Sequence, residues 1–296
     1  MALKAVRQRM IELGWCRNVV NRSVGRLKYV FKWTVSQELI PPTVHQSLAA
    51  VEGLKKGKSE ARETKKIKPV AEAHIDAVLA VVSPTIKAMI ELQLLTGMRS
   101  IELCIMRACD IDTSDDNLWA YRPQFHKTGH HGHDREVYLG ARAREIIRPL
   151  MTTDLQRYLF SPKDAEAWRH AQAKTHRRLN QKRNPRKTER EVRDRYDRDS
   201  YGRAIAYGCK KADMKAREER RKKLAAAGID LTPEQDLPIV PQWHPHQLRH
   251  NAGARFRRDY GLETAKCLLG QKTLDAAQLY AEQDVQRARQ IMAQVG

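Results

Sequence analysis

A charged stretch near the N-terminus, GLKKGKSEARETKKIKP (residues 53–69), divides the chain into two unequal parts. It contains glycines and many charged side chains but few apolar ones that a core could bury, which is typical of a linker. We therefore predict an N-terminal domain over residues 1–55, a linker over 56–70 and a second domain over 71–296. The lysines of the linker either lie in solvent or follow a phosphate backbone.

The residues before this stretch are predicted to be helical. Val20, Val24 and Leu27 recur at helical spacing, Phe31 continues the series, and basic residues occupy the other faces. The pair Pro41-Pro42 is expected to end this helix, because proline cannot continue one. A second short helix is predicted over residues 44–51.

The second part of the chain predicts further helices and one small sheet. Helices are expected over residues 75–82, 86–95, 101–106 and 142–150, with Gly97 closing the second and Ser100 capping the third. Residues 117–126 and 135–139 alternate partially, and KTGHHGHD between them has the glycines of a hairpin loop. The predicted fold class is therefore mainly α with a small antiparallel β-sheet.

A basic segment interrupts the second domain at about residues 161–223. Its centre, RRLNQKRNPRKTEREVRDRYDRD, has almost no apolar side chains, while residues 200–212 regain them and are expected to rejoin the core. We interpret the segment as an inserted arm. A solvated charge run and a DNA contact are both open, and they are compatible.

The overall charge points to a polyanionic partner. Lys and Arg number 55 against 35 Asp and Glu, which gives a formal charge of +20 and favours DNA or RNA. The five cysteines are scattered without a CxxC pair, as expected in a reducing interior. Because the chain has neither a long apolar run nor a hydrophobic signal core, we expect a cytoplasmic, nucleoid-associated protein without a membrane partner.

Two segments near the C-terminus could carry chemistry. In HPHQLRH (residues 244–250), Pro245 suits the first turn of a helix, so His246 would lie beside free N–H groups that favour anions. His246 and Arg249 would share one face, whereas Leu248, Ala252 and Phe256 would face the core. The alternative is an ordinary surface His and Arg on an amphipathic helix.

The second segment, LLGQKTLDAAQLY (residues 268–280), has Gly270 as a turn and Thr273 as a possible N-cap. Tyr280 then falls about two turns into a helix. A single Tyr on a helix is usually a packed residue with its hydroxyl at the surface, so this segment alone does not identify a site.

Taken together with three further residues, Arg99, Glu102 and Lys127, these segments resemble the tyrosine recombinase family, also called phage-type integrases. The resemblance runs in order through TGMRSIEL (residues 96–103), Lys127-Thr128 before REVYL (135–139), HQLRH (246–250), and LGQ (269–271) nine residues before Tyr280. It implies a helical core-binding domain and a mostly α catalytic domain with a small sheet, clamped around duplex DNA.

The resemblance also implies roles for single residues. Arg99 and Arg249 match the arginines that hold the scissile phosphate, and Tyr280 matches the nucleophile. The supporting positions are Lys127 in the hairpin, His246 in the H-x-x-R motif, and Glu102 beside the first arginine. Gln271 departs from the family, which usually has His and less often Trp there. The family's core-binding domain also has more helices than residues 1–55 can form, so we expect a truncated domain.

These residue types suit phosphoryl transfer. Negative charge develops on the non-bridging oxygens, and guanidinium groups offer a planar fork of donors to it. A phenol has a pKa of about 10, so Tyr280 needs nearby cations and a proton acceptor, for which His246 is available. Lys127 is the candidate acid for the departing 5′-oxygen. Gln271 can donate a hydrogen bond but cannot shuttle a proton. No metal and no other cofactor is expected.

The resemblance and the basic charge together indicate a set of DNA contacts in the N-terminal part. We predict that these residues are Arg22, Arg26, Lys32, Lys55, Lys56, Lys65 and Lys66. The hairpin histidines have a second interpretation as metal ligands, but a glycine-rich loop does not fix ligands. Hairpin-tip positions near DNA are expected instead for His126, His130, His131 and His133.

Four functions remain open from the sequence. A recombinase would act as a homotetramer on paired sites of double-stranded DNA, with accessory DNA-bending proteins. A type IB topoisomerase-like enzyme would nick and reseal one strand as a monomer. A metal-dependent HUH nickase is disfavoured by Pro245 within HPH and by the arginine pair. The fourth is an integrase remnant that only binds DNA.

The last helix, with Ile291 and Val295 on an apolar face, would pack on a neighbouring subunit or on its own domain.

Overall fold

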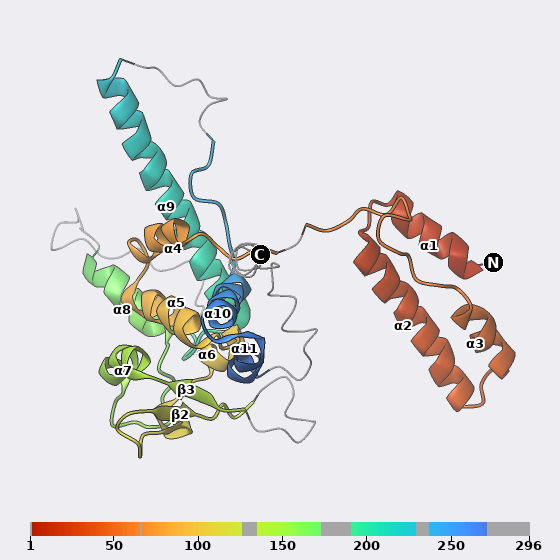
Figure 1. The fold of residues 1–296 in the computed structure, drawn as a ribbon, viewed down its shortest axis with the longest axis horizontal. Helices are drawn as coiled ribbons and strands as arrows, with labels where there is room; N and C mark the ends of the chain where they lie inside the picture. The colour runs from red at the N-terminus through yellow and green to blue at the C-terminus, as the bar shows by residue number, and fades with distance from the viewer. Residues whose placement is uncertain (1, 66, 126–134, 173–190, 229–236, 271–296) are drawn as a thin grey trace, which may run out of the picture. The chain divides into compact units, whose positions relative to one another are not determined.

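The structure is a computed structural model of the whole chain, and it describes residues 2–65, 67–125, 135–172, 191–228 and 237–270. The chain divides into two compact units, residues 1–67 and 68–296 (Figure 1). Within the described residues the fold is mainly α with one small antiparallel sheet, so the predicted fold class is confirmed. None of the described helices is both long enough and apolar enough to cross a lipid bilayer.

Over its described residues the first unit contains three helices, α1 (Ala2–Glu12), α2 (Arg17–Ser36) and α3 (Pro42–Ala49). Val20 and Val24 are buried together with Leu3 and Val51, and the helical stripe predicted for α2 is confirmed over these positions. Phe31 lies at the surface, so the buried stripe is shorter than predicted.

Part of the predicted linker packs against this unit. The Arg17 N–H donates to the carbonyl of Arg62 at 2.9 Å, and the Arg17 side chain pairs with Glu63 at 2.6 Å. Ala61, directly before these two residues, is buried. Residues 61–63 of the linker predicted over 56–70 are therefore held at the start of α2.

The second unit is built around α5 (Pro84–Thr96), whose Met89, Ile90 and Leu92 are fully buried. Helix α10 packs against α5 and α11, and α9 packs against α4 and α6. The helices of this unit are α4 (Glu72–Leu79), α6 (Ser100–Cys104), α7 (Ala141–Ile147), α8 (Pro162–Gln172), α9 (Arg198–Ala226), α10 (Pro245–Tyr260) and α11 (Leu262–Leu269), with short 3-10 turns η1 (Ala108–Asp110) and η3 (Arg148–Leu150).

The sheet has three antiparallel strands in the order β1 (Ile111–Asp112), β2 (Trp119–Tyr121) and β3 (Val137–Leu139). Trp119 pairs with Leu139, and Tyr121 pairs with Val137, so the four buried side chains share one face. The predicted antiparallel pairing is confirmed. Strand β1 was not predicted, because two residues are too few to show an alternating pattern.

The predicted insertion at about residues 161–223 differs from the structure at its start, whereas the expectation that residues 200–212 rejoin the core is confirmed. Ala165 of α8 is buried, and the first half of α9 is packed into the core through Tyr201, Ile205 and Cys209. A Cβ on Gly208 of α9 would come within 2.7 Å of Val82, so glycine permits a close helix contact there. The second half of α9 extends beyond the other helices (Figure 1).

Candidate active site

A tight turn between α5 and α6 carries the first candidate residue. Gly97 closes α5 in the left-handed conformation with φ 65°, as predicted. The N-cap of α6 is Arg99, and the prediction of Ser100 at this position is wrong. The reason is that the Arg99 N–H is satisfied by the Glu102 carboxylate, with Arg99 N to Glu102 Oε2 at 2.8 Å. The backbone of Arg99 is thus fixed by a hydrogen bond to a side chain in the first turn of the helix that it caps.

Gly97→Ala is expected to destabilise the second unit. The positive φ is unfavourable for alanine, and its Cβ would lie 2.5 Å from Leu269 Cδ2. We expect the free energy of unfolding in a denaturant titration to fall by about 2–4 kcal/mol, combining backbone strain with overpacking. Gly202→Ala in α9 is the control, because its Cβ would meet only Pro245 at 4.0 Å. Equal effects of the two substitutions would contradict the role of Gly97.

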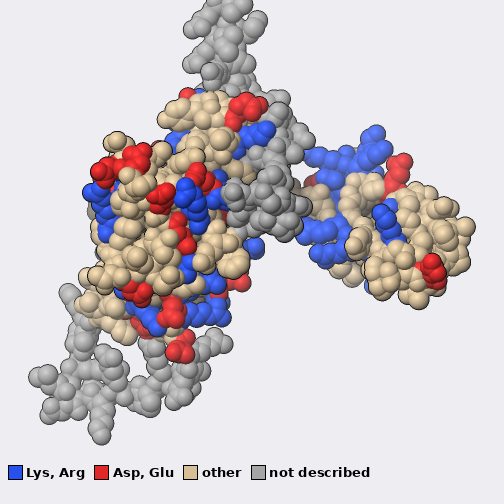
Figure 2. Space-filling model, turned by 90° about the horizontal axis from the view of Figure 1, so that it is seen from below, with Lys and Arg blue, Asp and Glu red and all other residues tan. Residues whose placement is uncertain are grey.

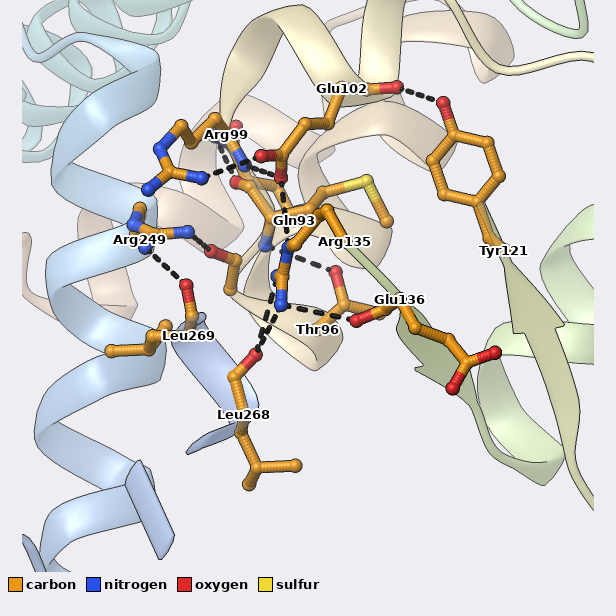
Figure 3. A network of polar contacts seen from close by, with 12 residues as sticks. Gln93, Thr96, Arg99, Glu102, Tyr121, Arg135, Glu136, Arg249, Leu268 and Leu269 are labelled. Carbon is orange, nitrogen blue, oxygen red and sulfur yellow. Dashed lines mark hydrogen bonds and ion pairs between the residues drawn. The ribbon is translucent and has the colours of Figure 1, made fainter. Parts of the chain in front are cut away.

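Glu102 holds the Arg99 side chain in place. Arg99 Nη1 lies 2.7 Å from Glu102 Oε1, and the carboxylate is completely buried while the arginine side chain is 23% exposed (Figure 3). The Tyr121 hydroxyl donates to the Glu102 carbonyl at 2.6 Å and anchors α6 to the sheet. The buried carboxylate is therefore paired, and the guanidinium keeps a partly open side.

Arg249 joins two segments that are distant in sequence. It lies on α10 and is buried, with Nη1 donating to Gly97 O at 2.6 Å and Nη2 donating to Leu269 O at 2.7 Å. Figure 3 shows its guanidinium beside that of Arg99. The turn after α5 and the C-terminal end of α11 consequently meet at a single arginine.

A third arginine, Arg135, belongs to the same cluster and was missed from the sequence. Its Nε lies 3.8 Å from Glu102 Oε2, and Nη1 and Nη2 both donate to Leu268 O at 3.3 Å. Burial lowers the pKa of Arg135; nearby Glu102 opposes this shift, while the charges of Arg249 and Arg99 add to it. The available signal was strand alternation, because residue 135 shares the inward face of Val137 and Leu139.

His246 lies at the N-terminus of α10 as predicted, directly after Pro245 at the first helical position. The predicted core positions Leu248, Ala252 and Phe256 are buried. Loss of surrounding water lowers the pKa of His246, and the neighbouring charge of Arg249 lowers it further. The imidazole is therefore neutral near pH 7 and can accept a proton.

His250 should make folding stability sensitive to acid. It packs edge-on against His246 with ring centroids 4.9 Å apart, and burial lowers its pKa to about 4. In the unfolded chain a histidine titrates near pKa 6.5, so the unfolded state binds the proton first as pH falls. The stabilisation is complete above about pH 6.5 and is lost between there and about pH 4.

His250→Gln is expected to flatten the decline of unfolding free energy between pH 6.5 and 4.5. One histidine contributes a slope of at most about 1.4 kcal/mol per pH unit. Denaturant titrations at several pH values, each expressed relative to the value at pH 7.5, should therefore show a smaller fall in unfolding free energy in acid for His250→Gln than for the unaltered protein. Parallel curves for the two proteins would contradict the assignment to His250.

The structure thus brings Arg99, Glu102, His246 and Arg249 together and adds Arg135. The other predicted site residues, Lys127, Gln271 and Tyr280, lie outside the described residues, as do the four hairpin histidines. Helix α11 ends at Gly270, which has φ 59° as expected for a turn. Within the described ranges, no group of three His, Cys, Asp or Glu side chains could hold a metal ion.

The predicted DNA contacts lie in the first unit. Arg22, Arg26 and Lys32 are exposed on α2, which has no acidic residue, and the exposed rings of Tyr29 and Trp33 lie on the same helix. The unit as a whole has 14 Lys and Arg against 5 Asp and Glu, and Figure 2 shows groups of basic side chains on its surface. The remaining members are Lys55, Lys56 and Lys65, which are exposed, and Lys66, which is outside the described residues.

Comparisons with known proteins agree on one family and one fold. The sequence model of the phage integrase family matches residues 69–287. A structure of the Tn1549 transposon integrase in complex with a circular intermediate DNA is 15% identical, with a TM-score of 0.62 over 99% of this chain and 84% of that chain. A lambda integrase dimer bound to a COC′ core site is also 15% identical, with a TM-score of 0.57 over 95% and 79%. No curated protein sequence matches the chain.

Proposed function

The chain belongs to the phage integrase family, and from this premise we propose that it is a site-specific recombinase that cuts and rejoins DNA through a 3′-phosphotyrosine. One observation carries the proposal. Arg99 and Arg249, which are 150 residues apart in sequence, lie beside each other with His246 near both of them. Such a cluster of cations suits one backbone phosphate.

The arginines stabilise the pentacoordinate phosphorus. Arg99, partly exposed and fixed by Glu102, donates to one non-bridging oxygen of the phosphate. Arg249 adds positive charge from α10, and its bonds to Gly97 O and Leu269 O fix where that charge lies. Because these donors are in place before DNA binds, little reorganisation is needed when negative charge develops.

In the proposed reaction, the Tyr280 oxygen attacks the phosphorus, and the bond from phosphorus to the 5′-oxygen breaks. His246, neutral near pH 7, accepts the phenol proton, and Lys127 gives a proton to the leaving 5′-oxygen. Gln271 donates a hydrogen bond to the phosphate. A 5′-hydroxyl of another strand then attacks the phosphotyrosine, which restores a phosphodiester and releases Tyr280 without ATP or metal.

Double-stranded DNA is the proposed partner, and the basic first unit would bind beside the cleavage site. The Tn1549 and lambda integrase structures with DNA support this. We further infer that the protein acts as a homotetramer on paired DNA sites, with the help of DNA-bending proteins. Its proposed location is the cytoplasm, in association with the nucleoid. A type IB topoisomerase-like enzyme would use the same cleavage chemistry, but it would relax supercoils without paired sites.

The test is covalent capture of DNA in EDTA. A library of randomised, nicked suicide duplexes is incubated with the protein, and DNA that remains attached in detergent is recovered and sequenced. We expect an adduct at the 3′-phosphate within one preferred sequence, and two copies of that sequence should then recombine. Supercoil relaxation without recombination would favour the topoisomerase alternative. DNA binding without an adduct would leave only a DNA-binding remnant.

Removal of two arginines from α2 tests the DNA contact of the first unit. The double substitution Arg22→Ala with Arg26→Ala is expected to weaken DNA binding and to reduce the slope of log K against log salt by about 2, which is about 1 for each lost phosphate contact. The control is Arg9→Ala on α1, since Arg9 is exposed but paired with Glu12 at 3.0 Å. An unchanged slope in the double variant would exclude these two contacts.

A further inference from the structure

We propose that Arg135 is a positioning residue for strand cleavage, which fixes the end of α11, and therefore the start of the segment that carries Tyr280, to the Arg99–Glu102 pair. This inference rests on the proposed function. It assigns a role to a side chain that would not itself touch the DNA.

The first step is that Arg135 connects three separate elements. From a position two residues before β3, it approaches Glu102 of α6 at 3.8 Å and donates to Leu268 O of α11 at 3.3 Å (Figure 3). Its Nη1 also donates to the carbonyl of Glu136 at 3.1 Å. The contact with Leu268 alone spans 133 residues of sequence. One guanidinium therefore holds together the start of β3, the Glu102 carboxylate that supports Arg99, and α11.

The second step concerns the carbonyls at the end of α11. The last carbonyls of a helix lack partners within the helix and carry its negative dipole end. Here Leu268 O accepts from Arg135, and the adjacent Leu269 O accepts from Arg249. Two arginines thus fix consecutive carbonyls just before Gln271, and the chain reaches Tyr280 nine residues later.

The fit around Gly270 supports this arrangement. Gly270 ends α11 with φ 59°, and a Cβ there would lie 2.7 Å from Arg135 Nη1. A side chain at position 270 would therefore displace the guanidinium or bend the backbone. Absence of a side chain at this residue lets the arginine reach the helix end.

The third step separates Arg135 from Arg99, the partly exposed arginine of the pair. Its side chain is 7% exposed, compared with 23% for Arg99, and its two Nη atoms both donate to backbone carbonyls. Its influence on cleavage must pass through the groups that it holds. Glu102 is shared, since Oε1 pairs with Arg99 and Oε2 faces Arg135.

Arg135→Lys is the informative variant, because lysine keeps the charge but cannot reach Glu102 and Leu268 O together. We expect the single-turnover cleavage rate at saturating protein to fall by about 100-fold, as for a misplacement of about 1 Å, while DNA affinity changes far less. The matched control is Arg107→Lys, in which a two-pronged pair with Asp110 at 2.9 Å is lost elsewhere in the same unit. The Arg107→Lys control should cleave at the wild-type rate, even if its thermal stability falls as much as that of Arg135→Lys.

A second substrate identifies the group through which Arg135 acts. A 5′-bridging phosphorothiolate has a sulfur leaving group that departs without a proton, so it makes an acid on the hairpin unnecessary. If Arg135 positions α11 and the nucleophile, the defect of Arg135→Lys persists on this substrate. Recovery to the wild-type rate would overturn the assignment and place the effect on Lys127, and a normal rate on the ordinary substrate would overturn it as well. Absence of any adduct with the unaltered protein would instead refute the proposed function.

Discussion

Tyr280→Phe is expected to abolish the covalent protein–DNA adduct, with a fall in cleavage of about 10⁴-fold or more, as when other enzymes lose their nucleophile. The phenol oxygen is the atom that bonds to phosphorus, and phenylalanine has no substitute for it. The measurement is the fraction of labelled suicide DNA that migrates with the protein in denaturing gels. DNA affinity should be nearly unchanged, since the substitution removes one hydroxyl.

Tyr260→Phe provides the matched control, because Tyr260 is an exposed tyrosine at the end of α10 in the same unit. This variant should form the adduct at the normal rate. Digestion of the adduct should show the protein attached to a 3′-phosphate, with a free 5′-hydroxyl on the other side of the break. An adduct that persists in Tyr280→Phe, or one attached to a 5′-phosphate, would contradict the assignment of the nucleophile.

Arg99→Ala and Arg249→Ala are each expected to reduce cleavage by about 10²- to 10³-fold, the usual effect of losing one donor to a developing oxyanion. The two variants should differ in stability. Arg249→Ala leaves the carbonyls of Gly97 and Leu269 without their charged donor, which costs about 1.5–3 kcal/mol for each bond. Arg99→Ala still leaves the buried Glu102 carboxylate two partners, which are the ion pair with Arg135 and the backbone N–H of residue 99.

Single-turnover cleavage and denaturant titration on the same preparations separate these effects. Arg255→Ala is a useful control, since Arg255 lies on α10 and donates to the carbonyls of Leu94 and Leu95 and not to a residue of the cluster. It should lose stability without a comparable loss in cleavage rate. Normal cleavage by either arginine variant, at a protein concentration that saturates the DNA, would remove that arginine from the phosphate site.

Local patterns in the sequence predicted much of the fold. The stripe on α10, the glycine that ends α5 and the pairing of β2 with β3 depend on neighbouring residues, and the structure agrees with each of them. The start of the insertion was placed too early, because α8 has only one buried side chain, Ala165, among many polar ones, whereas the apolar residues at 200–212 correctly predicted a return to the core.

The motif residues of the candidate site were predictable from the sequence, but the contacts that connect them were not. Arg99 and Arg249 stand in recognisable motifs, whereas Arg135 acts through contacts with residues far along the chain that no local period encodes. Ser100 was predicted to cap α6 on residue type, but the buried Glu102 carboxylate made Arg99 the cap. A carboxylate three residues into the helix can thus override the preference for Ser at the N-cap.

The short length of α11 has a consequence for the proposed cleavage reaction. This helix has only eight residues, and it is held by the small cluster of Ala252, Phe256, Ala265 and Leu269 together with the two arginine contacts at its end. Local opening of so small an element should require less free energy than global unfolding. An opened α11 would release Arg249 from one of its two anchors. Under the proposed function, a partly unfolded molecule would therefore lose strand cleavage before it lost its affinity for DNA.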